Sequence, residues 1–142
     1  MTHPAIIPVL RYGDAPTAID FLCRAFGFVE RARHLDSADP TKVVHAELMR
    51  NGQVVMLSSV MPTSFSLAAP MVTVAEAGGV TQSIYVVVDD VATHEQRARA
   101  EGARIIMPLT TEDYGGTSYS VRDCEGHVWT FGSYDPFEAA PR

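Results

Sequence analysis

The sequence has few cysteines, no long hydrophobic run and no export signal. Its two cysteines, Cys23 and Cys124, are far apart, and a disulfide framework needs more of them. We therefore expect free thiols and a cytoplasmic location. No stretch approaches the roughly 18 apolar residues of a membrane-spanning helix. The opening "MTHPAIIPVL" lacks the basic region and apolar run of a signal peptide, so we expect no membrane partner.

Positive charge is also scarce. The chain has 11 Lys and Arg against 17 Asp and Glu, which gives a formal net charge of −6. Nucleic-acid binding needs clustered basic residues, so we expect no nucleic-acid partner. What the chain does have is 46% hydrophobic residues over a length of 142, which is enough for one ordered domain with a core.

The first part of the chain predicts a strand, a helix, a short strand and a hairpin. The β-prone "AIIPVLRYGD" precedes "APTAIDFLCRAFGF", whose apolar residues recur at helical spacing between an Asp14 N-cap and a Gly27 stop. A short strand is expected near residues 29–34. The segment "VVHAELMRNGQVVMLSS" predicts a hairpin that turns at Asn51-Gly52, a strong type I′ signal.

The same order of elements recurs later in the chain. The segment "QSIYVVVDDVATHEQRARAEGARI" predicts a strand and helix, residues 105–108 a short strand, and "SYSVRDCEGHVWTFGS" a second hairpin. Gly102 follows Gly27 by 75 residues, and Gly126 follows Gly52 by 74. Two nearly equal offsets indicate an internal repeat of two modules, at about residues 4–60 and 81–135.

Residues 61–80 join the modules and are more apolar than an ordinary linker. They contain Phe65, Leu67, Met71 and Val72 among Pro, Ser, Thr and Gly. A flexible linker would be more polar, and an apolar loop of this length predicts a cover over a binding surface. We expect residues 1–142 to form a single domain.

These segments resemble the vicinal oxygen chelate superfamily, which includes glyoxalase I, extradiol dioxygenases, fosfomycin resistance enzymes and bleomycin resistance proteins. The resemblance lies in "VLRYGDAPTAIDFLCRAFGF", "HAELMRNGQVVML", "IYVVVDDVATHEQRARAEGA" and "VRDCEGHVWTFGSYDP". It implies an α+β fold of two βαβββ modules, which form an open, cup-shaped mixed sheet with helices on the convex face. It also implies a binding site on the concave face and a homodimer.

Metal-using members of that superfamily place ligands in the first and last strands of each module. In this sequence those positions hold Ile7, Met56, Ser83 (or Gln82, if the alignment slips by one) and Thr130. Divalent transition metals need imidazole, carboxylate or thiolate donors, so we predict neither a metal nor another cofactor. The predicted ligand-binding residues are Ile7, Val9, Arg11, Met56, Ser83, Tyr85, Val128 and Thr130, with Tyr114 as a cover. Arg11 is a candidate for holding an anionic group or for a salt bridge at the rim.

His45 and Glu47 stand two apart on a predicted strand and therefore share a face. They are candidates for a catalytic acid–base pair, for metal ligands at a non-standard position, or for a structural pair that satisfies itself. The offset of 74 places Tyr119 and Val121 at the equivalent positions of the second module, and neither side chain is a usual metal ligand.

Several other side chains have a predicted place. We expect Trp129 and Phe131 in the core behind the sheet, and Tyr12, Tyr119 and Tyr134 as candidates for stacking at the rim of the cup. We expect His94 on a solvated face of the second helix.

Two functions agree with these features. The first is a metal-independent small-molecule binding protein of the glyoxalase/bleomycin-resistance type, which holds a hydrophobic or aromatic organic ligand in the cup. The alternative is a glyoxalase-like lyase or isomerase, or a dioxygenase, that uses a non-standard metal or the His45/Glu47 pair. A purely structural module is a third reading, and the apolar connecting segment argues against it.

Overall fold

The structure is a computed structural model that describes residues 2–113 and 115–138. Over this part of the chain eight strands and four helices follow one another. They are β1 (Val9–Tyr12), α1 (Ala15–Phe26), β2 (Val29–Leu35), β3 (Val43–Arg50), β4 (Gln53–Ser59), α2 (Ser64–Ala68), α3 (Val74–Ala77), β5 (Ile84–Val87), α4 (Val91–Ala100), β6 (Arg104–Thr111), β7 (Thr117–Arg122) and β8 (Val128–Gly132). Among the described residues, none of the helices has the length and apolar character needed to cross a bilayer.

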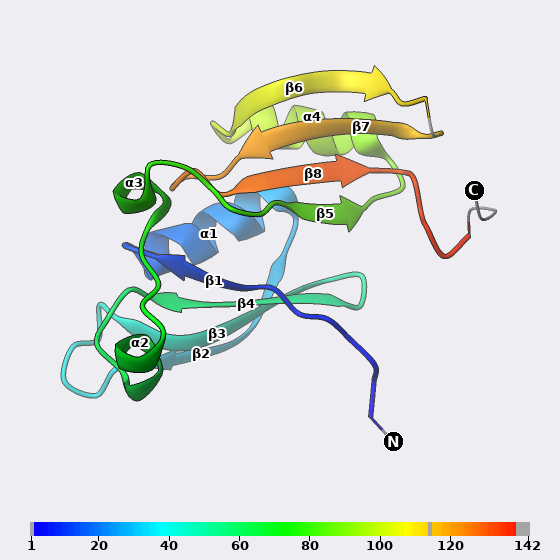
Figure 1. Cartoon of the computed structure of the whole chain (residues 1–142). Coiled ribbons are helices and arrows are strands. Elements are labelled where there is room, and N and C mark those ends of the chain that lie inside the picture. Colours follow the sequence, from blue (N-terminus) through cyan, green and yellow to red (C-terminus); the bar gives the residue numbers. More distant parts are fainter. Residues whose placement is uncertain (1, 114, 139–142) are drawn as a thin grey trace.

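The strands form two four-stranded mixed sheets with the same topology (Figure 1). Their orders are β1-β4-β3-β2 and β5-β8-β7-β6. In each sheet the first strand of the module runs parallel to the last, and the other neighbours are antiparallel. The predicted α+β fold of two βαβββ modules with open sheets is therefore confirmed. Within the described residues, the cup consists of two separate hydrogen-bonded sheets.

Both long helices begin at a capping aspartate. The Asp14 carboxylate accepts from the backbone N–H of Thr17 at 3.2 Å, and α1 ends at Gly27, which has a φ of 80°. In α4 the Asp90 carboxylate accepts from the backbone N–H of Thr93 at 3.1 Å. These caps satisfy backbone N–H groups that have no partner inside the helix. The two aspartates therefore fix the residues at which α1 and α4 begin.

The two modules share one core behind the sheets. The helices α1 and α4 lie on the convex side of the sheets and contact each other (Figure 1). The ring of Phe26 on α1 lies 5.5 Å from that of Trp129 and 4.8 Å from that of Phe131. Trp129 and Phe131, both on β8, are fully buried, as predicted. The first helix therefore packs against the last strand of the other module.

Three side chains that the sequence analysis placed at the surface are buried in this core. Tyr12 and Tyr119 are 0% and 1% exposed, so neither stacks at a rim, and His94 is only 6% exposed. The His94 Nε2–H donates to the carbonyl of Phe26 at 2.9 Å, and Nδ1 accepts from the Tyr119 hydroxyl at 2.5 Å. These predictions were wrong because each polar group finds a partner inside the protein, which helical spacing does not reveal.

The two hairpin turns differ in length by one residue. Asn51 and Gly52 form a two-residue turn with φ values of 47° and 77°. In the second hairpin the Asp123 N–H donates to the carbonyl of His127 at 2.9 Å, which leaves three residues, 124–126, in the turn. A three-residue turn with a left-handed glycine at its end is a common hairpin connection, and Gly126 has a φ of 96°.

The longer turn changes which residues are equivalent between the modules. Glu47 pairs with Met56 across β3 and β4, whereas Ser120 pairs with Thr130 across β7 and β8. The equivalents of His45 and Glu47 are therefore Ser118 and Ser120. The predicted equivalents, Tyr119 and Val121, were wrong, because an offset of 74 residues holds only after the hairpin turns and not before them.

The connecting segment between β4 and β5 contains α2 and α3, which the sequence analysis did not predict. Thr63 and Thr73 each form a capping box at the start of these helices, with Ser66 and Glu76 as the partners. The segment passes in front of the sheets, on the side opposite α1 and α4 (Figure 1).

Candidate functional site

Strand alternation separates a core face from a concave face. Val55 and Leu57 on β4 are buried toward the helices, whereas Val54 and Met56, which alternate with them, are half-buried. The strand β8 repeats this pattern with Val128 and Thr130 half-buried. Met56, Val128 and Thr130 therefore lie on the concave face, where the sequence analysis expected ligand contacts.

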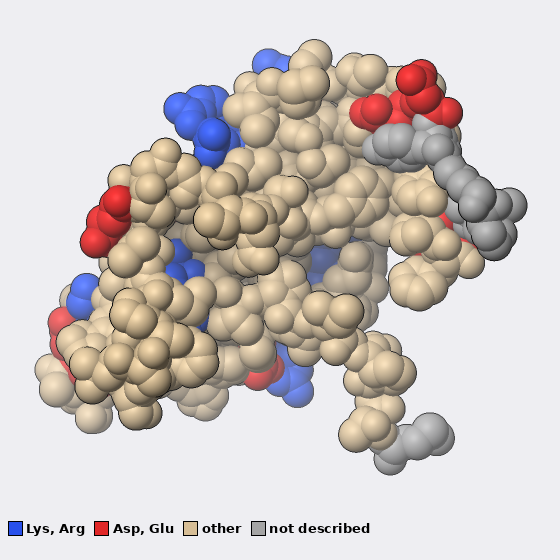
Figure 2. Space-filling view, in the orientation of Figure 1, with Lys and Arg blue, Asp and Glu red and all other residues tan. Residues whose placement is uncertain are grey.

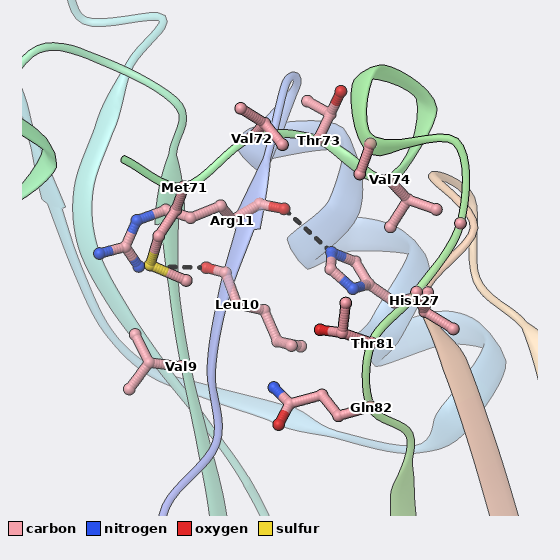
Figure 3. Close-up of a pocket in the computed structure, with 13 residues that line it drawn as sticks. Val9, Leu10, Arg11, Met71, Val72, Thr73, Val74, Thr81, Gln82 and His127 are labelled. Carbon is pink, nitrogen blue, oxygen red and sulfur yellow. Dashed lines mark hydrogen bonds between the residues drawn. The ribbon is translucent and has the colours of Figure 1, made fainter. Parts of the chain in front are cut away.

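One cavity of about 250 Å³ lies between β1 and the connecting segment, and we call it the connector cavity. Val9, Leu10 and Arg11 form one wall, residues 71–74 and 77–82 contribute the other, and His127 closes one end (Figure 3). Most of these side chains are apolar, and Thr81 and Gln82 add neutral polar groups. An apolar pocket with a few polar groups is the usual composition of a small-molecule site.

His127 fixes one end of the connector cavity. Its Nε2–H donates to the backbone carbonyl of Arg11 at 2.9 Å, and its ring packs edge-on against Tyr12 with centroids 4.8 Å apart. Because Nε2 donates, a neutral ring leaves Nδ1 as an acceptor. Figure 3 shows this second nitrogen on the side where Thr81 and Gln82 lie. The sequence analysis did not select His127, since only the tertiary fold brings it to β1.

Arg11 is the only charged side chain among the residues that line the connector cavity in the described part of the chain. Its guanidinium lies 5.8 Å from the ring centre of Phe65 on α2, within the range of a cation–π contact. Burial lowers the pKa of Arg11 from its ordinary value. The salt bridge considered for this residue does not form with any described carboxylate.

A second cavity, of about 440 Å³, lies between the N-terminal arm and the edge of β5, and we call it the arm cavity. Its walls include Ile7, Val54, Phe28 and Tyr85. The Tyr85 hydroxyl donates to the backbone carbonyl of Tyr134 at 2.8 Å, which holds the ring across Gly132. This cavity is also mainly apolar.

The positions at which the superfamily resemblance implies metal ligands carry unsuitable donors here. Met56 and Thr130 lie on the concave face, and the Thr130 hydroxyl is 2.7 Å from that of Ser120. Ser83 immediately precedes the ladder of β5, and Ile7 lies two residues before the first paired residue of β1. This donor set does not fit a divalent transition metal. Among residues 2–113 and 115–138, no group of three or more His, Cys, Asp and Glu side chains is arranged to hold one.

His45 and Glu47 contact each other on the concave face of β3. The His45 Nε2 lies 2.9 Å from Oε2 of Glu47, and the Arg31 guanidinium donates to Oε1. The hydrogen bond from His45 and the contact with Arg31 lower the pKa of Glu47. The ring of His34 on β2 stacks on His45 with centroids 6.1 Å apart. Neither residue of the pair is among those lining the two cavities.

Cys124 lies in the second hairpin turn and is exposed. Partial burial of its thiol, together with the carboxylates of Asp123 and Glu125, raises the pKa of Cys124 to about 12. The thiol therefore stays protonated near neutral pH and is a poor nucleophile.

The structure divides the predicted ligand-binding residues into three sets. Val9 and Arg11 line the connector cavity, and Ile7 and Tyr85 line the arm cavity. Met56, Ser83, Val128 and Thr130 are not among the residues that line either of these cavities. Tyr114 lies outside the described residues. The apolar character of residues 61–80 led us to expect a cover over a binding surface, and part of this segment lines the connector cavity, but its individual side chains were not among the predicted ligand-binding residues.

Comparison with known proteins gives consistent matches. The sequence matches the Glyoxalase/Bleomycin resistance protein/Dioxygenase superfamily over residues 3–131. An "uncharacterized protein" of Mycobacterium bovis is 36% identical over 130 residues, which cover 92% of this chain and 83% of that one. The crystal structure of TioX from Micromonospora sp. ML1 has 32% identity and a TM-score of 0.67, and covers 92% of this chain and 98% of TioX. The fosfomycin resistance protein FosX from Listeria monocytogenes, with 13% identity and a TM-score of 0.67, shares the fold over 97% of this chain and 98% of its own.

Proposed function

The chain belongs to the Glyoxalase/Bleomycin resistance protein/Dioxygenase superfamily, and from this membership we propose that it is a metal-independent binding protein for a small organic molecule. The ligand has a hydrophobic or aromatic body and lies on the concave side of the sheets. The connector cavity is its binding site, and the arm cavity extends the apolar surface beyond β1.

One observation carries the proposal. The four positions at which the superfamily resemblance implies metal ligands hold Ile7, Met56, Ser83 and Thr130, while a mainly apolar cavity lies between β1 and the connecting segment. The chain thus keeps the superfamily scaffold and a mainly apolar pocket without the donors for metal chemistry.

An enzyme that works through His45 and Glu47 is the second candidate. The distance of 2.9 Å between His45 Nε2 and the Glu47 carboxylate favours it, because a carboxylate that orients an imidazole is a common arrangement for a general base. It ranks second because Glu47 also binds Arg31, and because neither residue lines the two cavities.

We also propose that the protein is a cytoplasmic homodimer. Support for a dimer comes from the superfamily resemblance and from exposed apolar side chains such as Leu67, Ile106 and Met107. Support for the cytoplasm comes from the two free cysteines. Light scattering on the purified protein tests the dimer directly.

Metal analysis and thermal shift together test the proposed function. Protein purified without chelator should carry far less than one metal per chain and gain no stability from nickel, zinc or iron. A screen of aromatic and aliphatic molecules should yield ligands that raise the melting temperature by about 5 °C at saturating concentration. Val9→Trp, which fills the connector cavity, should remove this gain. Val29→Trp, at an exposed position of β2, serves as the control.

Two results would contradict the proposal. One is a stoichiometric metal whose removal destabilises the protein. The other is ligand stabilisation that survives unchanged in the Val9→Trp variant.

A further inference from the structure

Arg11 has no carboxylate partner among the described residues, and it is the arginine that lines the connector cavity. Ion pairs to Asp or Glu are formed by Arg24, Arg31, Arg33 and Arg99. Within residues 2–113 and 115–138, the Arg11 guanidinium donates one hydrogen bond, from Nη1 to the carbonyl of Leu10 at 3.5 Å, the outer limit for such a contact. A guanidinium has five N–H donors, so most of the hydrogen-bonding capacity of Arg11 is unused by the protein.

The surroundings of Arg11 favour a counter-charge. Phe65 lies over its guanidinium, and Figure 3 shows Met71 beside it at the wall of the connector cavity. These apolar neighbours remove part of its water, which disfavours the charged form and lowers its pKa. An anion placed next to Arg11 would restore the lost electrostatic stabilisation.

The rest of the connector cavity contains no opposing charge. No Asp or Glu is among the described residues that line it, although the whole chain has a net charge of −6. Figure 2 shows basic atoms recessed among uncharged ones between α2 and α3, while acidic atoms lie at the periphery of this face. Thr81, Gln82 and His127 give the far end of the cavity polar groups.

We infer that the ligand of the connector cavity is an amphiphilic organic anion whose acidic group binds Arg11. A carboxylate or sulfonate would accept charge-assisted hydrogen bonds from the guanidinium, with Phe65 closing over them. The apolar body would lie between β1 and residues 71–82, with any neutral polar group toward His127. This inference rests on the proposed function of the cavity as a ligand site.

A pair of fluorescent probes with one apolar body tests the inference. The sulfonate 8-anilinonaphthalene-1-sulfonate and its uncharged parent N-phenyl-1-naphthylamine differ only in the acidic group. Titration of the native protein should give at least tenfold tighter binding of the sulfonate. Arg11→Met should weaken sulfonate binding about tenfold, which corresponds to about 1.4 kcal/mol of binding free energy. The same substitution should leave the affinity for the neutral probe unchanged. Arg31→Met, at an exposed arginine paired with Glu47, should change neither affinity.

The outcomes separate the inference from the proposed function. Equal affinity of the two probes for the native protein, or equal effects of Arg11→Met and Arg31→Met, would overturn the inference and leave the cavity as a ligand site. Binding of both probes that is unaffected by Val9→Trp would overturn the proposed function as well. Melting temperatures verify that each variant is folded, and Arg11→Gln repeats the comparison if Arg11→Met is not.

Discussion

Asp123 receives four hydrogen bonds at the junction of the second hairpin with β1. Its carboxylate accepts from the Tyr12 hydroxyl at 2.6 Å and the Trp129 Nε1–H at 3.0 Å. Backbone N–H groups of Glu125 and His127 donate to it at 3.0 and 3.1 Å. Asp123 is only 6% exposed, so its carboxylate is hydrogen-bonded by the protein in place of water.

We predict that Asp123→Asn destabilises the protein by about 2–4 kcal/mol, because an amide turns one oxygen acceptor into a donor facing other donors. Urea unfolding followed by circular dichroism measures this change in the free energy of unfolding. Asp20→Asn, at an exposed carboxylate paired with Arg24, should cost less than about 0.5 kcal/mol. Equal effects of the two substitutions would show that the buried contacts do not stabilise the fold.

His94 makes the stability depend on pH. Burial lowers the pKa of His94 from 6.5 to about 4, so the folded protein binds a proton there less readily than the unfolded chain. Its contribution to stability is therefore complete above pH 6.5 and is lost as the pH falls from 6.5 toward 4. We predict that the free energy of unfolding declines over this window in the native protein.

The control for His94 is a side chain that cannot titrate. His94→Gln should be less stable at pH 7 but should show a flatter dependence of stability between pH 6.5 and 4. A series of urea titrations across this range provides the measurement. An unchanged slope in the variant would assign the pH dependence to other groups.

Residue by residue, apolar side chains were easier to place from the sequence than polar ones. Trp129 and Phe131 follow strand alternation and are buried as expected. Tyr12, Tyr119 and His94 carry polar groups whose burial depends on partners from distant segments. Those partners are unknown before the chain is folded, so a surface location was the natural expectation.

At the scale of elements, the connecting segment contacts the second hairpin turn through α3. A Cβ added to Gly126 would lie 3.2 Å from Cγ1 of Val74, whereas one added to Gly52 in the first turn would meet nothing within 4 Å. Both glycines have positive φ, 96° and 77°. The backbone cost of an alanine is therefore similar at the two positions, and only the contact with α3 differs.

We predict that Gly52→Ala costs about 1–2 kcal/mol of stability, as expected for an alanine in the left-handed region. Gly126→Ala should cost more, because Val74 must also move. If the packing of α3 forms the wall of the connector cavity, Gly126→Ala should also weaken probe binding, whereas Gly52→Ala should not. Urea unfolding and probe titration on the same samples measure both effects, and matching behaviour of the two variants would contradict the contact.

The repeat of strands and long helices follows from the sequence because each has a distinct period and clear end signals. The short helices do not, since 4–5 residues are too few to show a helical period. A usable signal was present in "TVAE", residues 73–76, where a threonine precedes a glutamate by three positions. The one-residue difference between the hairpin turns was hidden because a turn glycine occurs in both.

At the scale of the molecule, contacts between the two modules extend well beyond the core. The Glu125 carboxylate accepts from the backbone N–H groups of Gly13 and Asp14 at 2.7 and 2.8 Å. Arg97 on α4 donates to the carbonyl of Arg24 at the end of α1 at 2.6 Å. We propose on these grounds that the two modules and the connecting segment form a single domain.

The packing of distant segments against β1 explains why the candidate site was only partly predicted. Val9 and Arg11 were selected because they alternate along a predicted strand. The opposite wall, at residues 71–82, and His127 reach β1 only through the path of the connecting segment and the pairing of the modules. The apolar sequence of residues 61–80 predicts a cover, but which of its side chains reach β1 follows from tertiary packing.

A single domain should unfold in one cooperative transition, and the only tryptophan allows a direct test. Trp129 lies in the second module and packs against Phe26 of the first, so its fluorescence reports the interface between them. We predict that fluorescence and far-ultraviolet circular dichroism give the same urea midpoint. Phe26→Leu should lower both midpoints together, at a cost of about 1–3 kcal/mol, since the smaller side chain leaves space between α1 and β8. Val29→Ala, at an exposed position, is the control and should leave both midpoints unchanged. Different midpoints for the two signals in the native protein would show that the modules unfold independently.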